Sequence, residues 1–252
     1  MPELEFANDL EAQQQIASLR AQLEHAQRMA IVGELASTTT HEFNNILMTI
    51  INYAKLGLRH KDELSRNKSL QKIHDAASRA AKLTSTVLSM SRSRTGSFEP
   101  TDLRPVIDDT MLLMEREFRK YRINIETRLD AVPNVNASPS QMQRVLLNLL
   151  VNARQATQEG GMVSIGWQHD ADTQEAVLTV RDSGKGISKE VLPKIFDPFF
   201  STKDGPDESG KGGTGLGLAA CKQTIDAHGG RIRVESSLGK GTCFIIRLPI
   251  AA

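Results

Sequence analysis

The chain of 252 residues carries a formal net charge of +1, and its residues are 39% hydrophobic and 24% charged. This balance is ordinary for a globular protein and gives no reason to expect nucleic acid or an anionic membrane as a partner. Aromatic residues make up only 4%, which argues against a surface that stacks single-stranded bases. The two cysteines form no CxxC motif and fit a reducing compartment. The N-terminus is polar and no run of about 18 apolar residues occurs, so we expect a cytoplasmic protein without direct membrane insertion.

The first part of the chain, from residue 8 to about 95, has a helical pattern. Apolar residues from Ala12 to Gly33 recur at steps of four and three, which predicts a coiled-coil helix over residues 1–30. That helix continues into the stretch STTTHEFNNILMTI, residues 37–50. A polar turn is expected over 58–67, followed by a second helix from about Ser65 to Arg94. Two helices cannot bury their apolar stripes alone, so we expect residues 31–97 to form an antiparallel hairpin that dimerises into a four-helix bundle.

The stretch SRTGSFEPTDL, residues 93–103, breaks the helical pattern and marks a domain boundary. From residue 98 to 252 the chain mixes elements. Helices are predicted over 103–121, 138–157 (with Ser138 as N-cap and Pro139 at the first helical position) and 214–230. Strands are predicted over 123–129, 162–168, 176–182, 231–237 and 243–249. The fold class is therefore α+β multidomain, with an α/β sandwich that places helices on one face of a mixed sheet.

Two asparagines interrupt the apolar face of the helix predicted over 138–157. Asn148 and Asn152 are four residues apart and so lie on one face, although asparagine is a poor residue for a helix interior. Their side-chain oxygens could ligate Mg²⁺, a hard cation that takes oxygen ligands. A buried pair satisfied by each other or by water explains the pattern equally well.

One glycine-rich turn follows a predicted strand, and a second glycine-rich run leads into a predicted helix. In VRDSGKGI, Asp182 stands at a strand end where it can accept from an exocyclic amine, and the glycines let backbone approach a flat ring; an acidic turn is the alternative. SGKGGTGLGLAA runs into a helix and offers backbone amides to phosphate oxygens. Between them, IFDPFFSTKDGPDESGKGG predicts a mobile lid tethered by an aromatic clamp. Lys203 at its base could reach a phosphate or be a solvated loop lysine.

The order of these motifs resembles the sensor histidine kinases of two-component signalling. HEFNN is similar to the H box, NLLVNA to the N box, DSGKGI to the first glycine box, FDPFFSTK to the F box, GGTGLGLA to the second glycine box and GKGT to the last. The likeness covers about residues 28–249. His41 alone would be read as an inert helix residue, and the accompanying motifs reverse that reading.

The resemblance implies ATP-dependent autophosphorylation of His41, with Glu42 as general base, followed by transfer to an aspartate of a response-regulator receiver domain. Asn45 would position a water for dephosphorylating that regulator. Asn152 and Asn148 would hold Mg²⁺ on the phosphates of ATP, and Asp182 would bind the adenine amino group. The remaining nucleotide-binding positions implied by the family are Gly184, Gly186, Phe199, Lys203, Gly213, Thr214, Gly215, Leu216, Gly217 and Thr242.

The chain departs from the family at some positions, and two other functions compete with the kinase reading. Ile46 stands where many members have proline, and Ser183 where asparagine is commoner. No sensor or receiver domain is recognised, so an upstream sensor domain or a partner would supply the signal. One rival is a gyrase-like ATPase that clamps a dimer, but such proteins carry a glutamate near the position of Asn148. The other is a non-catalytic helical scaffold, which the intact glycines disfavour.

Overall fold

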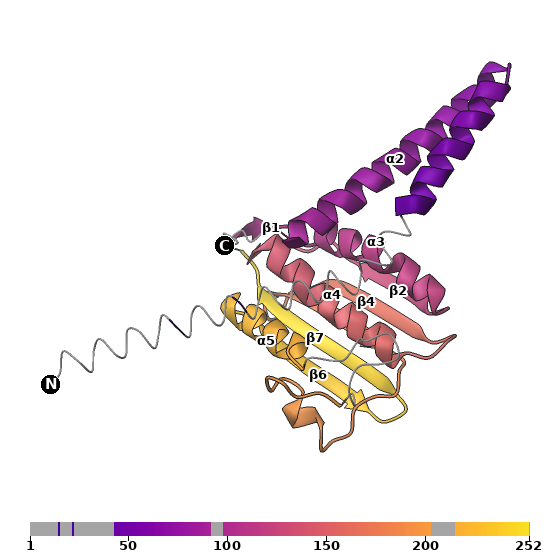
Figure 1. Ribbon diagram of the computed structural model, residues 1–252. Coiled ribbons are helices and arrows are strands. Elements are labelled where there is room, and N and C mark those ends of the chain that lie inside the picture. Colours follow the sequence, from indigo (N-terminus) through magenta and orange to yellow (C-terminus); the bar gives the residue numbers. More distant parts are fainter. Residues whose placement is uncertain (1–14, 16–21, 23–42, 92–97, 203–214, 252) are drawn as a thin grey trace.

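The computed structural model describes Gln15, Gln22 and residues 43–91, 98–202 and 215–251 (Figure 1). Apart from those two glutamines, the predicted coiled coil over residues 1–30 lies outside the described residues. His41, Glu42, Lys203, Gly213 and Thr214 lie outside them as well. Among the described residues, no helix is both long enough and apolar enough to cross a membrane.

The first part of the structure is a helical hairpin that projects from the rest of the molecule (Figure 1). A helix over residues 43–59 is followed by α2, Glu63–Ser91. Asp62 caps α2, because its Oδ1 accepts a hydrogen bond from the Ser65 backbone N–H at 2.8 Å. The predicted hairpin is confirmed, but its turn is confined to residues 60–62 and is shorter than the predicted 58–67.

Over the part of the hairpin whose side chains the structure describes, residues 43–81 and 84, few apolar residues are buried. Ile46 on the first helix and Ala76 on α2 are buried. The large apolar side chains that remain exposed on it are Phe43, Leu47, Met48, Ile51, Leu56, Leu58, Leu64 and Leu70. A single hairpin therefore leaves an extended apolar surface in water, as the sequence pattern predicts.

The second part is a mixed sheet with helices on one face (Figure 1). Its five strands are β2 (Asn124–Leu129), β4 (Met162–Asp170), β5 (Glu175–Asp182), β6 (Arg231–Ser237) and β7 (Gly241–Pro249). They lie in the order β2-β4-β5-β7-β6, with β2 parallel to β4 and every other pair antiparallel. The covering helices are α3 (Arg104–Lys120), α4 (Pro139–Ala156) and α5 (Gly217–Ala227). The predicted α/β sandwich is confirmed.

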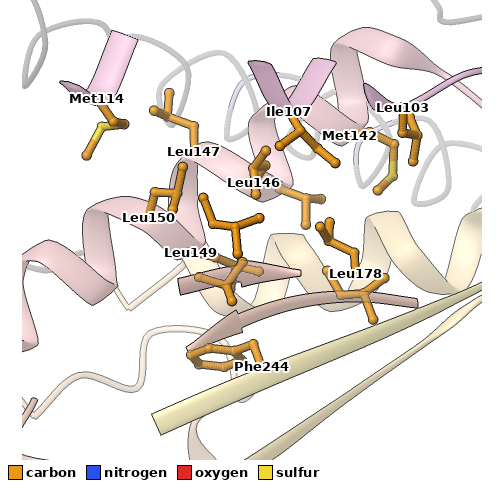
Figure 2. Packing of buried hydrophobic residues seen from close by; sticks show 14 of the residues in the cluster. Leu103, Ile107, Met114, Met142, Leu146, Leu147, Leu149, Leu150, Leu178 and Phe244 are labelled. Atoms are coloured by element: carbon orange, nitrogen blue, oxygen red, sulfur yellow. The ribbon is translucent and has the colours of Figure 1, made fainter. Parts of the chain in front are cut away.

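Helix α4 lies at the centre of the core. Figure 2 shows its leucines between side chains of α3 and side chains of the sheet, among them Leu178 and Phe244. Leu146, Leu147 and Leu149 are almost completely buried. Each buried leucine contributes about 1.5–3 kcal/mol relative to an exposed one. This packing fixes the rotation of α4 and therefore the face on which Asn148 and Asn152 lie.

The structure also contains elements that the sequence did not predict. Strand β1 (Glu99–Thr101) pairs antiparallel with β3 (Val135–Ala137) in a separate two-stranded sheet. A 3-10 turn, η1, spans Leu192–Lys194. Ser138 occupies the N-cap of α4 as predicted, but its side chain makes no capping hydrogen bond. Its Oγ lies 3.4 Å from Ser140 Oγ instead.

Candidate active site

Asp182, the last residue of β5, is a buried carboxylate with a single fixed oxygen. Its residue surface is 4% exposed. The backbone N–H groups of Gly184 and Thr242 both donate to Oδ1, at 2.8 Å and 3.2 Å. No described residue donates to Oδ2. Burial raises the pKa of Asp182, and the two backbone hydrogen bonds oppose that rise without cancelling it. The arrangement suits a ligand that brings its own N–H donor to Oδ2.

The loops on either side of Asp182 are packed so closely that only glycine fits. A Cβ on Gly184 would overlap the Ala156 carbonyl oxygen and lie 2.8 Å from Asp182 Oδ1. Gly241 has a φ of +85°, and a Cβ there would overlap the carbonyl oxygen of Asp182. The end of α4, the turn after β5 and the start of β7 therefore meet at this carboxylate.

A serine that the sequence analysis did not single out ties these loops to the sheet edge. Ser236 Oγ on β6 accepts a hydrogen bond from the Ile187 N–H at 2.8 Å and donates to the Gly241 carbonyl at 2.9 Å. It also lies 3.0 Å from Thr242 Oγ1. The predicted site residue Thr242 is thus buried within a hydrogen-bonded network. The alternation of RIRVESS predicts only a strand, so no sequence signal marked Ser236.

Asn148 and Asn152 are partly buried on α4, and the structure bears on the two explanations for them. No hydrogen bond joins the two amides, so they do not satisfy each other. Asn148 Oδ1 faces the first turn of α5, where a Cβ on Gly217 would lie 3.7 Å from it. Among the described residues, no group of three or more His, Cys, Asp or Glu side chains could hold a metal. A Mg²⁺ here would be held by amide oxygens together with ligand phosphates, a donor set that suits this cation.

The seam between α4 and α5 contains Cys221, whose Sγ donates to the Val145 carbonyl oxygen at 3.8 Å. Complete burial raises the pKa of this thiol to about 12. Cys243 is buried as well, and burial raises its pKa. Both cysteines are therefore unreactive packing residues.

Phe199, within the predicted lid, and Gly215, two residues after it, lie in contact. Gly215 has a φ of +67°, and a Cβ on it would lie 2.7 Å from the carbonyl oxygen of Phe199. Leu216 then leads into α5. The predicted aromatic clamp does not form as one cluster, because Phe199 is 72% exposed whereas Phe196 packs against the core. Lys222 Nζ lies 5.9 Å from the centre of the Phe196 ring.

Asn45 is exposed on the helical hairpin and does not join the residues around Asp182. It lies at a hollow of about 140 Å³ between the two helices. The residues that line this hollow are Asn45, Ile46, Thr49, Lys72, Asp75, Ala76 and Arg79. Neither Lys72 nor Arg79 forms an ion pair with a described residue, so two cationic side chains border the surface beside Asn45.

Comparison with known families matches both parts of the chain. Residues 31–96 match the model of the His Kinase A (phospho-acceptor) domain. Residues 137–252 match the model of the histidine kinase-, DNA gyrase B-, and HSP90-like ATPase.

Among curated proteins, sensor kinase CckA of Brucella abortus (strain 2308) is 38% identical over 247 residues, which cover 92% of this chain and 26% of that protein. The signal transduction histidine-protein kinase AtoS of Escherichia coli (strain K12) is 33% identical over 245 residues, which cover 96% of this chain and 38% of that protein. The chain thus spans well under half the length of these two relatives.

Among solved structures, a nucleotide-free form of the catalytic domain of histidine kinase ThkA is 32% identical with a TM-score of 0.51, covering 60% of this chain and 95% of that one. A structure of ThkA in complex with the response regulator protein TrrA is 27% identical with a TM-score of 0.52, covering 93% of this chain and 66% of that one. With its phosphoacceptor and ATP-binding domains both matched, the chain belongs to the sensor histidine kinases of two-component systems.

Proposed function

We propose that this chain transfers the γ-phosphoryl group of ATP to His41 and then passes it to an aspartate of a response-regulator receiver domain. The observation that carries the proposal is the buried Asp182 carboxylate, with Oδ1 held by two backbone amides and surrounded by loops that admit only glycine. That arrangement suits the adenine amino group. The same chain contains a helical hairpin that matches the phosphoacceptor domain family.

Nucleotide binding divides between the two glycine-rich regions. Asp182 Oδ2 would accept a hydrogen bond from the adenine amino group, and Gly184 and Gly186 would let the backbone lie close to the ring. At the other end of the site, Gly217 is the first residue of α5 and Gly215 lies just before it. The backbone amides at the N-terminus of this helix would donate hydrogen bonds to phosphate oxygens. Lys203 and Gly213 are assigned to the same phosphates from the sequence, and Thr214 to nucleotide binding. Thr242 would act at the adenine end, because its backbone N–H donates to Asp182 Oδ1.

Asn152 and Asn148 would hold Mg²⁺, because they are four residues apart on α4 and Asn148 Oδ1 lies beside the start of α5. The bound ion would neutralise charge on the phosphate oxygens during transfer. The two asparagines orient the phosphates relative to α5, whose N-terminus supplies further positive potential. Transfer of this kind depends mainly on positioning and electrostatics, which are the contributions these residues can make.

The covalent step requires a nucleophile and a place for its proton. One imidazole nitrogen of His41 would form the N–P bond while the bond between the γ-phosphorus and the bridging oxygen breaks, and ADP leaves with that electron pair. Glu42 would accept the hydrogen bond of the other imidazole nitrogen, fix the tautomer and take up the proton. In the second step the aspartate of the receiver would attack the same phosphorus and release the histidine.

A homodimer follows from the exposed apolar surface of the hairpin, which includes Phe43, Leu47, Met48 and Ile51. Pairing two hairpins into a four-helix bundle would cover this surface. Light scattering at micromolar concentration should give the mass of a dimer. A monomer under those conditions would contradict this part of the proposal.

Phosphatase activity toward the regulator is proposed from Asn45, which is exposed where a partner could approach. The neighbouring Lys72 and Arg79 would contribute positive charge toward an acidic partner surface, and Asp75 lines the same hollow. Asn45 would orient a water molecule toward the phosphorylated aspartate of the docked receiver.

A clamp ATPase of the same nucleotide fold is the main alternative, and helix α4 disfavours it. Simple hydrolysis needs a base that activates water, and α4 contains no acidic residue anywhere along its length. Asn148, at the position expected for such a glutamate, cannot act as that base.

The deciding experiment is incorporation of γ-labelled phosphate from Mg-ATP into the wild-type protein and into His41→Gln. We expect acid-labile, base-stable label in the wild type and none in the variant, with equal nucleotide affinity in calorimetry. ATP hydrolysis that is equal in both proteins, without any label, would instead establish the clamp function.

A further inference from the structure

His228 is a buried histidine whose hydrogen bonds define its protonation state. It is the C-cap of α5 and is 4% exposed. The backbone N–H of Ser138 donates to its Nε2 at 3.1 Å, so Nε2 carries no proton. Nδ1 lies 2.7 Å from the Thr224 carbonyl oxygen and donates to it. The imidazole is therefore neutral, in the tautomer with the proton on Nδ1.

The same imidazole contacts the segment that leads from the hairpin into the ATP-binding domain. We call Phe98 to Thr101 the incoming segment. The ring of Phe98 packs on His228 with 4.6 Å between ring centres, at an angle of 58°. Beyond it, Glu99 pairs with Ala137, and Thr101 Oγ1 lies 3.1 Å from the Ala137 carbonyl oxygen. His228 thus joins the incoming segment, the start of α4 and the end of α5.

Helix α5 connects this junction to the phosphate side of the site. It is a single helix of 11 residues, Gly217–Ala227. Its first residue lies against Asn148, and its C-cap is His228. A helix of this length moves as one rigid body. A shift of the incoming segment at the C-terminal end of α5 therefore also shifts its N-terminal end, where the ATP phosphates would bind.

We propose that His228 is a positioning residue for phosphoryl transfer to His41. By fixing Phe98 and Ser138 to the end of α5, it sets how the ATP-binding domain is presented to the hairpin. The inference rests on the proposed function. Transfer needs the reacting atoms about 3–3.5 Å apart, and a misplacement of about 1 Å can cost on the order of a hundredfold in rate. Nucleotide binding, which involves residues at the opposite end of α5, does not depend on this junction.

The test separates the rate of histidine phosphorylation from nucleotide affinity. His228→Phe keeps a ring of similar volume but leaves the Ser138 N–H without an acceptor. We expect its rate of label incorporation at saturating ATP to fall about tenfold or more, while the Kd for ADP in calorimetry stays within about twofold. His228→Gln, whose side-chain oxygen can accept from Ser138, should recover part of the rate.

Phe98→Ala provides a second route in case His228→Phe does not fold. This variant removes the ring that packs on His228. Because Phe98 is 43% exposed, the change should disturb the fold little, and it should lower the rate of His41 phosphorylation in the same way. The double variant should lose less than the product of the two single effects, because both act on one contact. Tyr121→Ala is the matched control: Tyr121 is 41% exposed, lies at the end of α3 and should leave the rate unchanged.

Each outcome decides the inference. An unchanged rate in both His228→Phe and Phe98→Ala, in a wild type that labels normally, would overturn it and leave the proposed function intact. A parallel loss of ADP affinity and rate would also overturn it, because that pattern indicates general structural damage. A wild type that binds nucleotide but takes no label would reject the proposed function, and this inference with it.

Discussion

Replacing Asp182 with asparagine should weaken nucleotide binding without weakening the fold. Gly184 and Thr242 both donate to Oδ1, so the amide of Asp182→Asn would keep its oxygen there. Its NH₂ group would then stand in the place of Oδ2. An adenine amino group arriving at that point would meet a donor instead of an acceptor.

The size of the effect follows from the hydrogen bond that is lost. A hydrogen bond to a charged group contributes about 1.5–3 kcal/mol. Because each 1.4 kcal/mol is about a factor of ten, the Kd for ADP should rise roughly 10- to 150-fold. The NH₂ group of the asparagine and the amino group of adenine are both donors, and their repulsion adds to this loss. We therefore expect a rise in Kd near the upper end of that range.

The stability of the unliganded protein should change in the opposite direction. Burial raises the folded-state pKa of Asp182 above its ordinary value of 3.8. A carboxyl group with a raised folded pKa stabilises the fold at low pH, and this contribution is lost as the pH rises through the folded pKa. At neutral pH the ionised carboxylate of Asp182 therefore lowers the free energy of unfolding. The neutral asparagine removes this effect, so Asp182→Asn should melt at the same temperature as the wild type or higher.

Calorimetry with ADP and thermal melting of the free protein measure the two effects separately. Asp170→Asn is the control, since Asp170 lies on the same sheet and pairs with Arg247 rather than with the glycine loops. Its ADP affinity should equal that of the wild type. An unchanged affinity in Asp182→Asn would refute the adenine role, and a joint loss of affinity and melting temperature would refute the reasoning on stability.

Further predictions concern the close packing, the partner and the buried histidine. In a urea titration, Gly241→Ala should lower the free energy of unfolding by about 1–3 kcal/mol, because φ is positive there and the new Cβ would overlap the Asp182 carbonyl oxygen. Gly239→Ala is the control and should lower it by less, because a Cβ on Gly239 would face open space. Asn45→Ala should keep histidine phosphorylation but lose regulator dephosphorylation, and unchanged dephosphorylation would exclude the phosphatase role. Burial lowers the pKa of His228, so its contribution to stability is present above the ordinary value of 6.5 and is lost as the pH falls toward the folded pKa. Urea midpoints at pH 7.5 and 5.5 should therefore fall further in the wild type than in His228→Phe, and equal falls would contradict this assignment.

The elements with strong local patterns could be predicted from the sequence. Strand β6 was predicted at its observed bounds, Arg231–Ser237, because alternation and the flanking glycines define it locally. The helix bearing Asn148 was recognised from its apolar periodicity and from Pro139 at its first position. The glycine-rich turns were also picked out from the sequence, although the close packing that requires glycine at Gly184 and Gly241 is visible only in the structure.

The rest depends on pairing between distant residues, which no local pattern encodes. Strands β1 and β3 have three residues each, too few for alternation to show, and they exist through contacts such as Thr101 to Ala137, 36 residues apart. The hydrogen bond from Ser138 to His228 spans 90 residues. For the same reason the sequence singles out Asp182 as a candidate for adenine binding, which stays a prediction, but does not show which of its oxygens is held by the protein.

The contact between Phe199 and Gly215 has a consequence for how this protein can vary. Because the backbones at these two positions touch, Phe199 and Gly215 are held against each other by the folded domain although they lie 16 positions apart in the sequence. The entropy of closing a flexible loop grows slowly with its length, by about 0.6 kcal/mol for each doubling. For a connection between two such fixed positions, a change in length therefore costs little stability, and the number of residues between Phe199 and Gly215 can vary while the domain keeps its fold.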